Sequence, residues 1–170
     1  FNYVSHPTNL GLTAGVQTGM KYALRHGYEM AIQFDADGQH DPAYISSLVA
    51  KMDEAQADIV VGSRFVTEEK PKSLRMMGSN LISGMIKLTT GARIKDPTSG
   101  MRLYNKRAIQ LFATQDWTSP EPDTLACLIR KGYKVEEVQV SMRERTAGES
   151  YLNLTRSISY MANTCMSILF

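Results

Sequence analysis

Two acidic side chains one residue apart are the sharpest chemical signal in the sequence. Asp35 and Asp37 follow directly after residues 29–34, a short apolar run with the pattern of a buried strand. Strand ends of parallel sheets open into the crevice where ligands bind, and two neighbouring carboxylates repel each other unless a cation or a proton lies between them. A hard divalent cation such as Mg²⁺ or Mn²⁺, shared with the phosphates of a substrate, is the usual partner of such a pair.

A turn, a calcium loop and a phosphatase motif each fit this acidic segment less well. A plain turn with a capping aspartate accounts for Asp41, but not for the two acids before it. A calcium-binding helix-loop-helix that began at Asp35 would need a glycine at its sixth position, where His40 stands. A metal-dependent phosphatase of the haloacid dehalogenase type also has Asp-x-Asp after a strand, but normally has Thr or Val where Gln39 stands. The phosphatase is kept as an alternative function.

Positive charge is concentrated in the middle of the chain. The net charge is only +2, yet residues 64–107 contain ten lysines and arginines against three acids. Such a block indicates phosphates, an anionic lipid surface or nucleic acid nearby, or else a solvated face with scattered lysines. It lacks the interleaved aromatic residues that stack on bases, so we expect no nucleic-acid partner.

The pattern of elements predicts one α/β domain with a largely parallel sheet. Short apolar runs alternate with helical periodicity along the 170 residues, and the hydrophobic content of 43% is enough for a core. Leu12, Val16, Met20 and Leu24 mark one face of the first helix, and Ile45, Leu48, Val49 and Met52 the buried face of the second. Strands are expected at 1–5, 29–34, 58–62, 101–104 and 134–142, and helices at 12–26, from 42, at 74–88, 106–112, 122–130 and 154–168.

An ordered set of motifs along nearly the whole chain resembles family 2 glycosyltransferases, in particular the branch similar to dolichyl-phosphate mannosyltransferase. A single Asp-x-Asp is weak evidence, whereas this set is specific because its members occur in the right order and spacing. They are Asn9-Leu10-Gly11, Asp35-Ala36-Asp37-Gly38-Gln39-His40-Asp41-Pro42, Gly62-Ser63-Arg64, Asp96-Pro97-Thr98-Ser99-Gly100-Met101-Arg102, Gly132-Tyr133-Lys134-Val135 and Arg145-Thr146-Ala147-Gly148-Glu149-Ser150.

The resemblance implies a GT-A fold, a Rossmann-like layered α/β/α arrangement with a mostly parallel sheet, over residues 1–150. Members of the family normally have two further strand-helix units before the Asn-x-Gly segment, and these bind the nucleotide base. Neither unit stands here, so we expect the catalytic domain to be partial and truncated at its N-terminus. Residues 151–170 are expected to form a separate amphipathic helix, a candidate for lying at a membrane surface.

The resemblance also implies an inverting sugar transfer from a nucleotide diphosphate sugar, with Mg²⁺ or Mn²⁺ as cofactor. Guanidinium groups suit the phosphates because they bind two phosphate oxygens at once and stay charged. The residues predicted for catalysis are Asp37, Arg102, Glu121 and Asp96. Those predicted to bind the donor or a phosphate are Asp35, Gln39, Arg64, Arg145 and Ser150, and those for the metal are Asp35, Asp37 and Gln39.

The acceptor decides whether a base is needed. A glycan hydroxyl must lose a proton during attack, for which Glu121, Asp123 and Asp96 are the candidates. A polyprenyl phosphate is already an anion, and the basic block with the apolar last helix favours it. We therefore expect a protein at the cytoplasmic face of a membrane. A non-catalytic module that binds a nucleotide sugar or a lipid phosphate is the second alternative.

Overall fold

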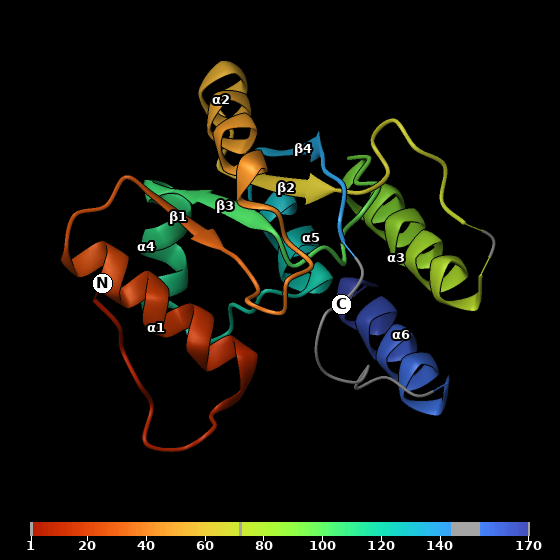
Figure 1. Cartoon of the computed structure of the whole chain (residues 1–170). Helices are drawn as coiled ribbons and strands as arrows, with labels where there is room; N and C mark the ends of the chain where they lie inside the picture. The colour runs from red at the N-terminus through yellow and green to blue at the C-terminus, as the bar shows by residue number, and fades with distance from the viewer. Residues whose placement is uncertain (1, 72, 144–153, 170) are drawn as a thin grey trace.

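A four-stranded β-sheet forms the centre of the structure, a computed structural model that describes residues 2–71, 73–143 and 154–169 (Figure 1). The strands lie in the order β1-β3-β2-β4. Three of them point the same way, and β3 runs antiparallel to both of its neighbours, so the largely parallel sheet expected from the sequence is a mixed one. The strands are β1 (Met30–Gln33), β2 (Ile59–Ser63), β3 (Arg102–Asn105) and β4 (Val135–Gln139).

Helices connect the strands close to the expected positions. The acidic cap of Asp41 begins a short 3-10 turn, η1 (Pro42–Tyr44), by accepting a hydrogen bond from the N–H of Ala43. Gly91, at φ 75°, ends α3 in the left-handed conformation. The helices are α1 (Gly11–Arg25), α2 (Ile45–Ala55), α3 (Leu74–Thr90), α4 (Lys106–Thr114), α5 (Pro122–Arg130) and α6 (Leu154–Leu169).

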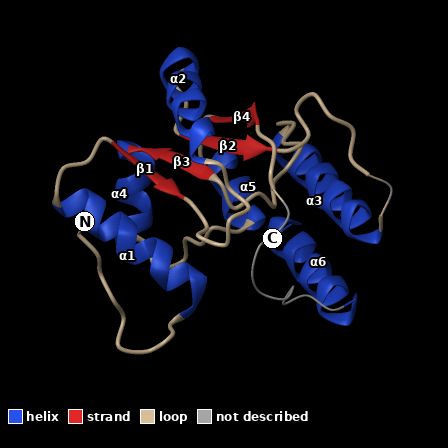
Figure 2. Ribbon diagram, in the orientation of Figure 1, coloured by secondary structure: helices blue, strands red, loops and turns tan. Residues whose placement is uncertain are grey.

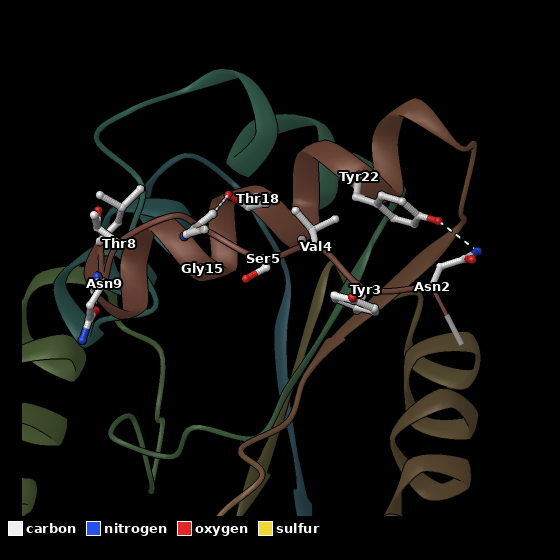
Figure 3. A pocket seen from close by; sticks show the side chains of 13 residues that line it. Asn2, Tyr3, Val4, Ser5, Thr8, Asn9, Gly15, Thr18 and Tyr22 are labelled. Atoms are coloured by element: carbon white, nitrogen blue, oxygen red, sulfur yellow. Dashed lines mark hydrogen bonds between the residues drawn. The ribbon is translucent and has the colours of Figure 1, made fainter.

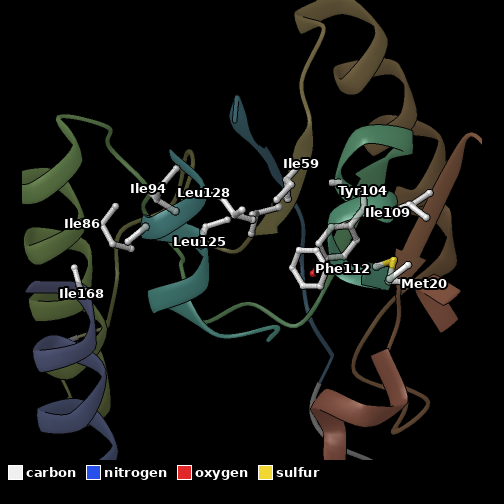
Figure 4. Packing of buried hydrophobic residues seen from close by; sticks show 14 of the residues in the cluster. Met20, Ile59, Ile86, Ile94, Tyr104, Ile109, Phe112, Leu125, Leu128 and Ile168 are labelled. Atoms are coloured by element: carbon white, nitrogen blue, oxygen red, sulfur yellow. The ribbon is translucent and has the colours of Figure 1, made fainter. Parts of the chain in front are cut away.

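Two apolar cores confirm the layered α/β/α arrangement (Figure 2). On one face of the sheet, Leu48 and Met52 of α2 pack with Val60 of β2. The opposite face packs against α1, α4 and α5, and the ring of Tyr104 meets that of Phe112 edge-on at 5.0 Å (Figure 4). α3 and α6 pack against each other and join this second core through residues such as Ile86 and Ile168 (Figures 1 and 4).

The predicted strand at 1–5 is wrong. Residues 2–5 have no strand partner and run in extended form along α1, to which they are tied by side chains. Asn2 Nδ2 donates to the hydroxyl of Tyr22 at 3.4 Å, and His6 Nε2 lies 2.8 Å from Thr18 Oγ1. A strand exists only where a neighbour takes its backbone hydrogen bonds, and no such neighbour is present in the described part of the chain.

The predicted face of α1 is only partly right. Met20 is buried and Val16 packs on the core, but Leu12 and Leu24 are exposed because Ala23 takes the inner position beside Met20. The predicted face of α2 is confirmed.

The topology brings several motif segments to one edge of the sheet. β1 and β2 end there, and Asp35 and Arg64 follow them. Because β3 runs the other way, its first residue, Arg102, lies at the same edge and pairs with Gln33 and Val61. This edge is therefore where the sequence motifs meet.

Candidate active site

The loop that carries the two acids is tied by its own hydrogen bonds. The N–H of Gln39 donates to Asp37 Oδ1 at 3.0 Å, and the N–H of Asp35 donates to His40 Nδ1 at 3.0 Å. Gly38 allows the tight turn between them, since its φ is 82°. On the outer side, the N–H of Arg143 donates to the carbonyl oxygen of Gln39. The carboxylates are thus held on a short, closed loop.

The end of this loop is fixed to the chain beyond β4. Arg143 Nη2 donates to Asp41 Oδ2 at 2.6 Å. The backbone hydrogen bond from Ala43 and then this guanidinium hold the pKa of Asp41 below its usual value. Asp41 is therefore an ionised cap and not a member of the site.

Arg64 and Asp96 form a two-pronged ion pair under the site. Arg64 Nε and Nη2 donate to the two carboxylate oxygens at 2.7 and 2.8 Å, and the backbone N–H of Arg64 donates to the same group. Asp96 is 0% exposed, and its hydrogen bonds raise the pKa of Arg64. Arg64 Nη1 makes no hydrogen bond to any described residue. The geometry suits Asp96 to holding Arg64, and Arg64 to offering its remaining donors.

Arg102 lies deep in the same region, at 2% exposure. Its Nε donates to the carbonyl oxygen of Ser99 and its Nη2 to that of Pro97, at 3.0 and 2.7 Å. Ser99 Oγ in turn donates to the carbonyl oxygen of Gly62. Arg102 therefore fixes the turn at 97–100 against the end of β2 and brings a buried positive charge to the site.

Glu121 stands at the start of α5 but does not cap the helix with its side chain. Its Oε2 instead accepts a hydrogen bond from the hydroxyl of Tyr160 on α6, at 2.5 Å. Burial, and next this hydrogen bond, raise the pKa of Tyr160 strongly, so the phenol stays protonated and keeps donating. The carboxylate of Glu121 thus binds the last helix and does not serve as a simple cap.

A cavity of about 410 Å³ brings most of these side chains together. Asp37 and Asp96 are not among its lining residues, although each is bonded to a residue that is. Arg145 and Ser150 lie outside the described residues, so their predicted roles stay predictions. The predicted site residues that line the cavity are Asp35, Gln39, Arg64, Arg102 and Glu121.

The acidic loop has the chemistry of a hard-cation site. The carboxylate of Asp35 receives no hydrogen bond or ion pair from any described residue, although it is half-buried. Two carboxylates and the amide oxygen of Gln39 are the oxygen ligands that Mg²⁺ and Mn²⁺ prefer. No group of three or more His, Cys, Asp or Glu side chains gathers in the described ranges, so substrate phosphates or water would complete the ligand set.

Several lining residues of this cavity were not predicted from the sequence. His40 stands inside the acidic motif, which could have suggested a role for it. Ser79 and Tyr160 reach the cavity from α3 and α6, and only the packing of these helices reveals them.

A second cavity, of about 530 Å³, lies between the N-terminal segment and α1 (Figure 3). Tyr3, Tyr22, Asn9 and His6 line it, and no carboxylate, lysine or arginine of the described residues does. It therefore lacks the carboxylates and guanidinium groups that characterise the cavity at the sheet edge.

Comparison with known proteins identifies the family to which the chain is similar. Residues 1–112 match the family described as Glycosyl transferase family 2. Members of this family are generally metal-dependent, and the α/β fold with its mixed sheet is of the GT-A type expected from the motifs.

Curated relatives agree with this match. A polyprenol monophosphomannose synthase of Mycolicibacterium smegmatis is 30% identical over 159 residues, which cover 89% of this chain and 60% of the relative. An undecaprenyl-phosphate mannosyltransferase of Micrococcus luteus is 31% identical, covering 89% of this chain and 65% of the relative. A UDP-N-acetylglucosamine–dolichyl-phosphate N-acetylglucosaminyltransferase of Methanococcus voltae is 30% identical, covering 66% and 46%. The chain thus spans less than two thirds of the length of these relatives.

Proposed function

The chain belongs to glycosyl transferase family 2, and from this membership we propose that the protein transfers a sugar from a metal-bound nucleotide diphosphate sugar to a polyprenyl phosphate, with inversion. The observation that carries the proposal is the cavity at the sheet edge, where the acidic loop meets Arg64 and Arg102. The names of the relatives, which refer to polyprenol, dolichyl or undecaprenyl phosphate, support the acceptor class.

The donor's diphosphate is assigned to the acidic loop. Asp35, Asp37 and Gln39 would hold Mg²⁺ or Mn²⁺, because they offer hard oxygen ligands on a closed turn. When bound, this cation neutralises the negative charge that builds on the departing nucleoside diphosphate. Arg102 adds a fixed positive charge to the same cavity, and Arg145 and Ser150 are assigned to the donor phosphates on the resemblance alone.

The acceptor phosphate is assigned to Arg64. Its Nε and Nη2 are held by Asp96, so the guanidinium is pre-oriented and Nη1 can grip a phosphate oxygen. A lipid phosphate is ionised at neutral pH, and its oxygen can attack the sugar without a general base. For a glycan acceptor, Glu121 would be the base, since its carboxylate lines the cavity.

The membrane contact is assigned to α3. The last helix, expected from the sequence to lie apart from the domain at a membrane surface, instead packs its apolar side against α3 and α5, where Ile168 is 0% exposed. Met77, Leu81 and Leu88 of α3 are 65%, 54% and 76% exposed and recur at helical spacing on one face. Beside them is a recess of about 400 Å³ lined by one acid, Glu68, and by four basic side chains, Lys70, Lys87, Arg93 and Lys95. Exposed apolar groups next to cations suit an anionic membrane surface, and we place the protein at the cytoplasmic face. No helix in the described ranges is long and apolar enough to cross a bilayer.

The test of this function is a calorimetric titration: UDP or GDP is added to the full-length protein with and without Mn²⁺, and the heat of binding is measured. Asp37→Asn should abolish the metal-dependent binding and leave the fold intact. The matched control is Asp53→Asn, since Asp53 is exposed on α2, away from the cavity, and should change nothing. A folded wild-type protein that binds neither diphosphate would refute the donor site.

Turnover separates the remaining alternatives. Transfer of sugar to a short polyprenyl phosphate supports the proposal. Diphosphate binding without transfer would identify a binding module, and release of inorganic phosphate from small phosphoesters would identify a phosphatase.

A further inference from the structure

His40 is buried next to the proposed metal loop and has no part in the function as assigned so far. It is 7% exposed, and its ring lines the cavity at the sheet edge. It lies one residue after Gln39 and five after Asp35. A buried imidazole at this place either only fills space or also fixes part of the loop through a hydrogen bond. The hydrogen bond that His40 forms distinguishes these two roles.

The hydrogen bond runs from the backbone N–H of Asp35 to His40 Nδ1, at 3.0 Å. A backbone N–H can only donate, so Nδ1 carries no proton and accepts. The ring is therefore assigned as the tautomer with its proton on Nε2. His40 thus closes the loop at its first residue, while the N–H of Gln39 closes it at Asp37.

Two residues lie close to the imidazole ring. The ring of Phe34 meets it edge-on, with centroids 5.3 Å apart. Gly100 lies nearby, and a Cβ added there would stand 3.6 Å from His40 Cε1 and 2.8 Å from Asp35 Oδ2. The ring and the carboxylate of Asp35 therefore both lie close to Gly100, where the absence of a side chain leaves room for the carboxylate.

We propose that His40 is a positioning residue that sets the geometry of the cation site, by anchoring the backbone of Asp35 so that the carboxylates of Asp35 and Asp37 converge. This inference rests on the proposed function, because it concerns the same metal loop. The role differs from space filling in one respect: it needs an acceptor atom at the place of Nδ1 and not merely a ring of that size.

Three variants of the full-length protein test this difference. His40→Asn keeps an acceptor, because Asn Oδ1 branches from Cγ as Nδ1 does. His40→Gln moves the acceptor one bond further out, and His40→Phe keeps a ring without any acceptor. The measurement is the affinity for Mn²⁺ alone, from the electron paramagnetic resonance signal of free Mn²⁺, with the thermal midpoint of each variant recorded beside it.

We expect His40→Phe and His40→Gln to weaken Mn²⁺ binding about 10- to 100-fold, as loss of a residue that orients a metal ligand does. His40→Asn should stay within about threefold of the wild type, although it removes the ring contacts. Equal affinities for His40→Asn and His40→Gln would overturn the proposal, as would a loss of affinity that follows the loss of thermal stability. These two variants are close in size and polarity, so they decide the question even where His40→Phe fails to fold.

Failure of the proposed function looks different. There the wild-type protein itself binds no Mn²⁺, and the inference falls with the site. Where the wild type binds Mn²⁺, Asp37→Asn does not, and all His40 variants match the wild type, the site stands and only the role of His40 is refuted.

Discussion

Tyr160 and Glu121 join the last helix to the start of α5 through one hydrogen bond. We expect Tyr160→Phe to lower the free energy of unfolding by about 1 kcal/mol at neutral pH, the usual net value of such a bond. The phenol has its pKa raised above the ordinary 10 by burial and by Glu121. Its contribution is therefore fully present below pH 10 and is lost as the pH rises towards the folded pKa.

The measurement is the thermal midpoint of both proteins at a series of pH values on either side of 10. The wild type should lose its advantage over Tyr160→Phe in the alkaline part of the series. Tyr28→Phe is the matched control, because Tyr28 is exposed and its hydroxyl forms no hydrogen bond with any described residue. Parallel curves for the wild type and Tyr160→Phe would show that the phenol does not carry this interaction.

The place of a single residue could be predicted where a sequence motif determines it, but not where it depends on a partner far away in the sequence. Asp35, Gln39, Arg64 and Arg102 were placed at one site from their motifs, and the cavity brings them together. The burial of Asp96 could not be predicted, because it depends on Arg64, which lies 32 positions earlier in the chain. A carboxylate in a polar motif looks like a candidate base until its partner is known.

At the scale of elements, most helices and strands could be predicted, because period and caps are local properties. Asp41 with Pro42 and the glycine after α3 mark helix ends by their own chemistry. The face that a helix buries is less local. α3 exposes Met77, Leu81 and Leu88 and buries Ile82 and Ile86, because α5 and α6 pack against the side that carries the two isoleucines.

The contact between α3 and α6 can be tested at Gly78. A Cβ added there would lie 1.7 Å from the sulfur of Met161 on α6, so a larger side chain fits only if Met161 or α6 moves. We expect Gly78→Leu to destabilise the protein by about 1–3 kcal/mol through overpacking and to raise amide hydrogen exchange throughout α6. Because Met161 and Tyr160 line the cavity, diphosphate binding should weaken as well.

Gly84→Leu is the control on the same helix. Gly84 is exposed, and nothing stands within 4 Å of its added Cβ, so this variant should exchange hydrogen in α6 at the wild-type rate. Equal hydrogen exchange of α6 in Gly78→Leu and Gly84→Leu would mean that the docking of α6 does not require a glycine at position 78.

At the scale of the whole molecule, the order of the strands was beyond the sequence. Alternating helices and strands predict a parallel sheet, and β3 breaks that pattern by entering between β1 and β2 in the opposite direction. No residue of β3 indicates the direction in which the strand runs, because antiparallel and parallel strands contain the same kinds of apolar side chains. Yet this reversal places Arg102 at the edge that also holds Asp35 and Arg64.

The proposed membrane contact is also a property of the whole molecule. The exposed stripe belongs to α3, which also lines the basic recess, and α3 lies on the opposite side of the molecule from α1 (Figure 1). We expect the wild type to sediment with vesicles that contain anionic phospholipid and less with neutral ones, and the binding to fall as salt is added. Leu81→Glu with Leu88→Glu should abolish sedimentation, because it places two charges in the apolar stripe.

Lys87→Gln with Arg93→Gln should weaken binding to anionic vesicles about 10- to 30-fold, since each cation near such a surface contributes about 1 kcal/mol. It should leave the weak binding to neutral vesicles unchanged. Tyr28→Glu is the control, because Tyr28 is exposed and lies in the chain just after α1, a helix on the far side of the molecule from α3 (Figure 1). If Tyr28→Glu lowers sedimentation as much as the α3 variants do, the protein has no preferred face and α3 is not its membrane surface.

The α3 variants also separate membrane binding from catalysis. If they bind vesicles poorly but still transfer sugar to a short, water-soluble polyprenyl phosphate, the exposed stripe of α3 is needed only to reach the bilayer, and the residues of the cavity carry out the transfer.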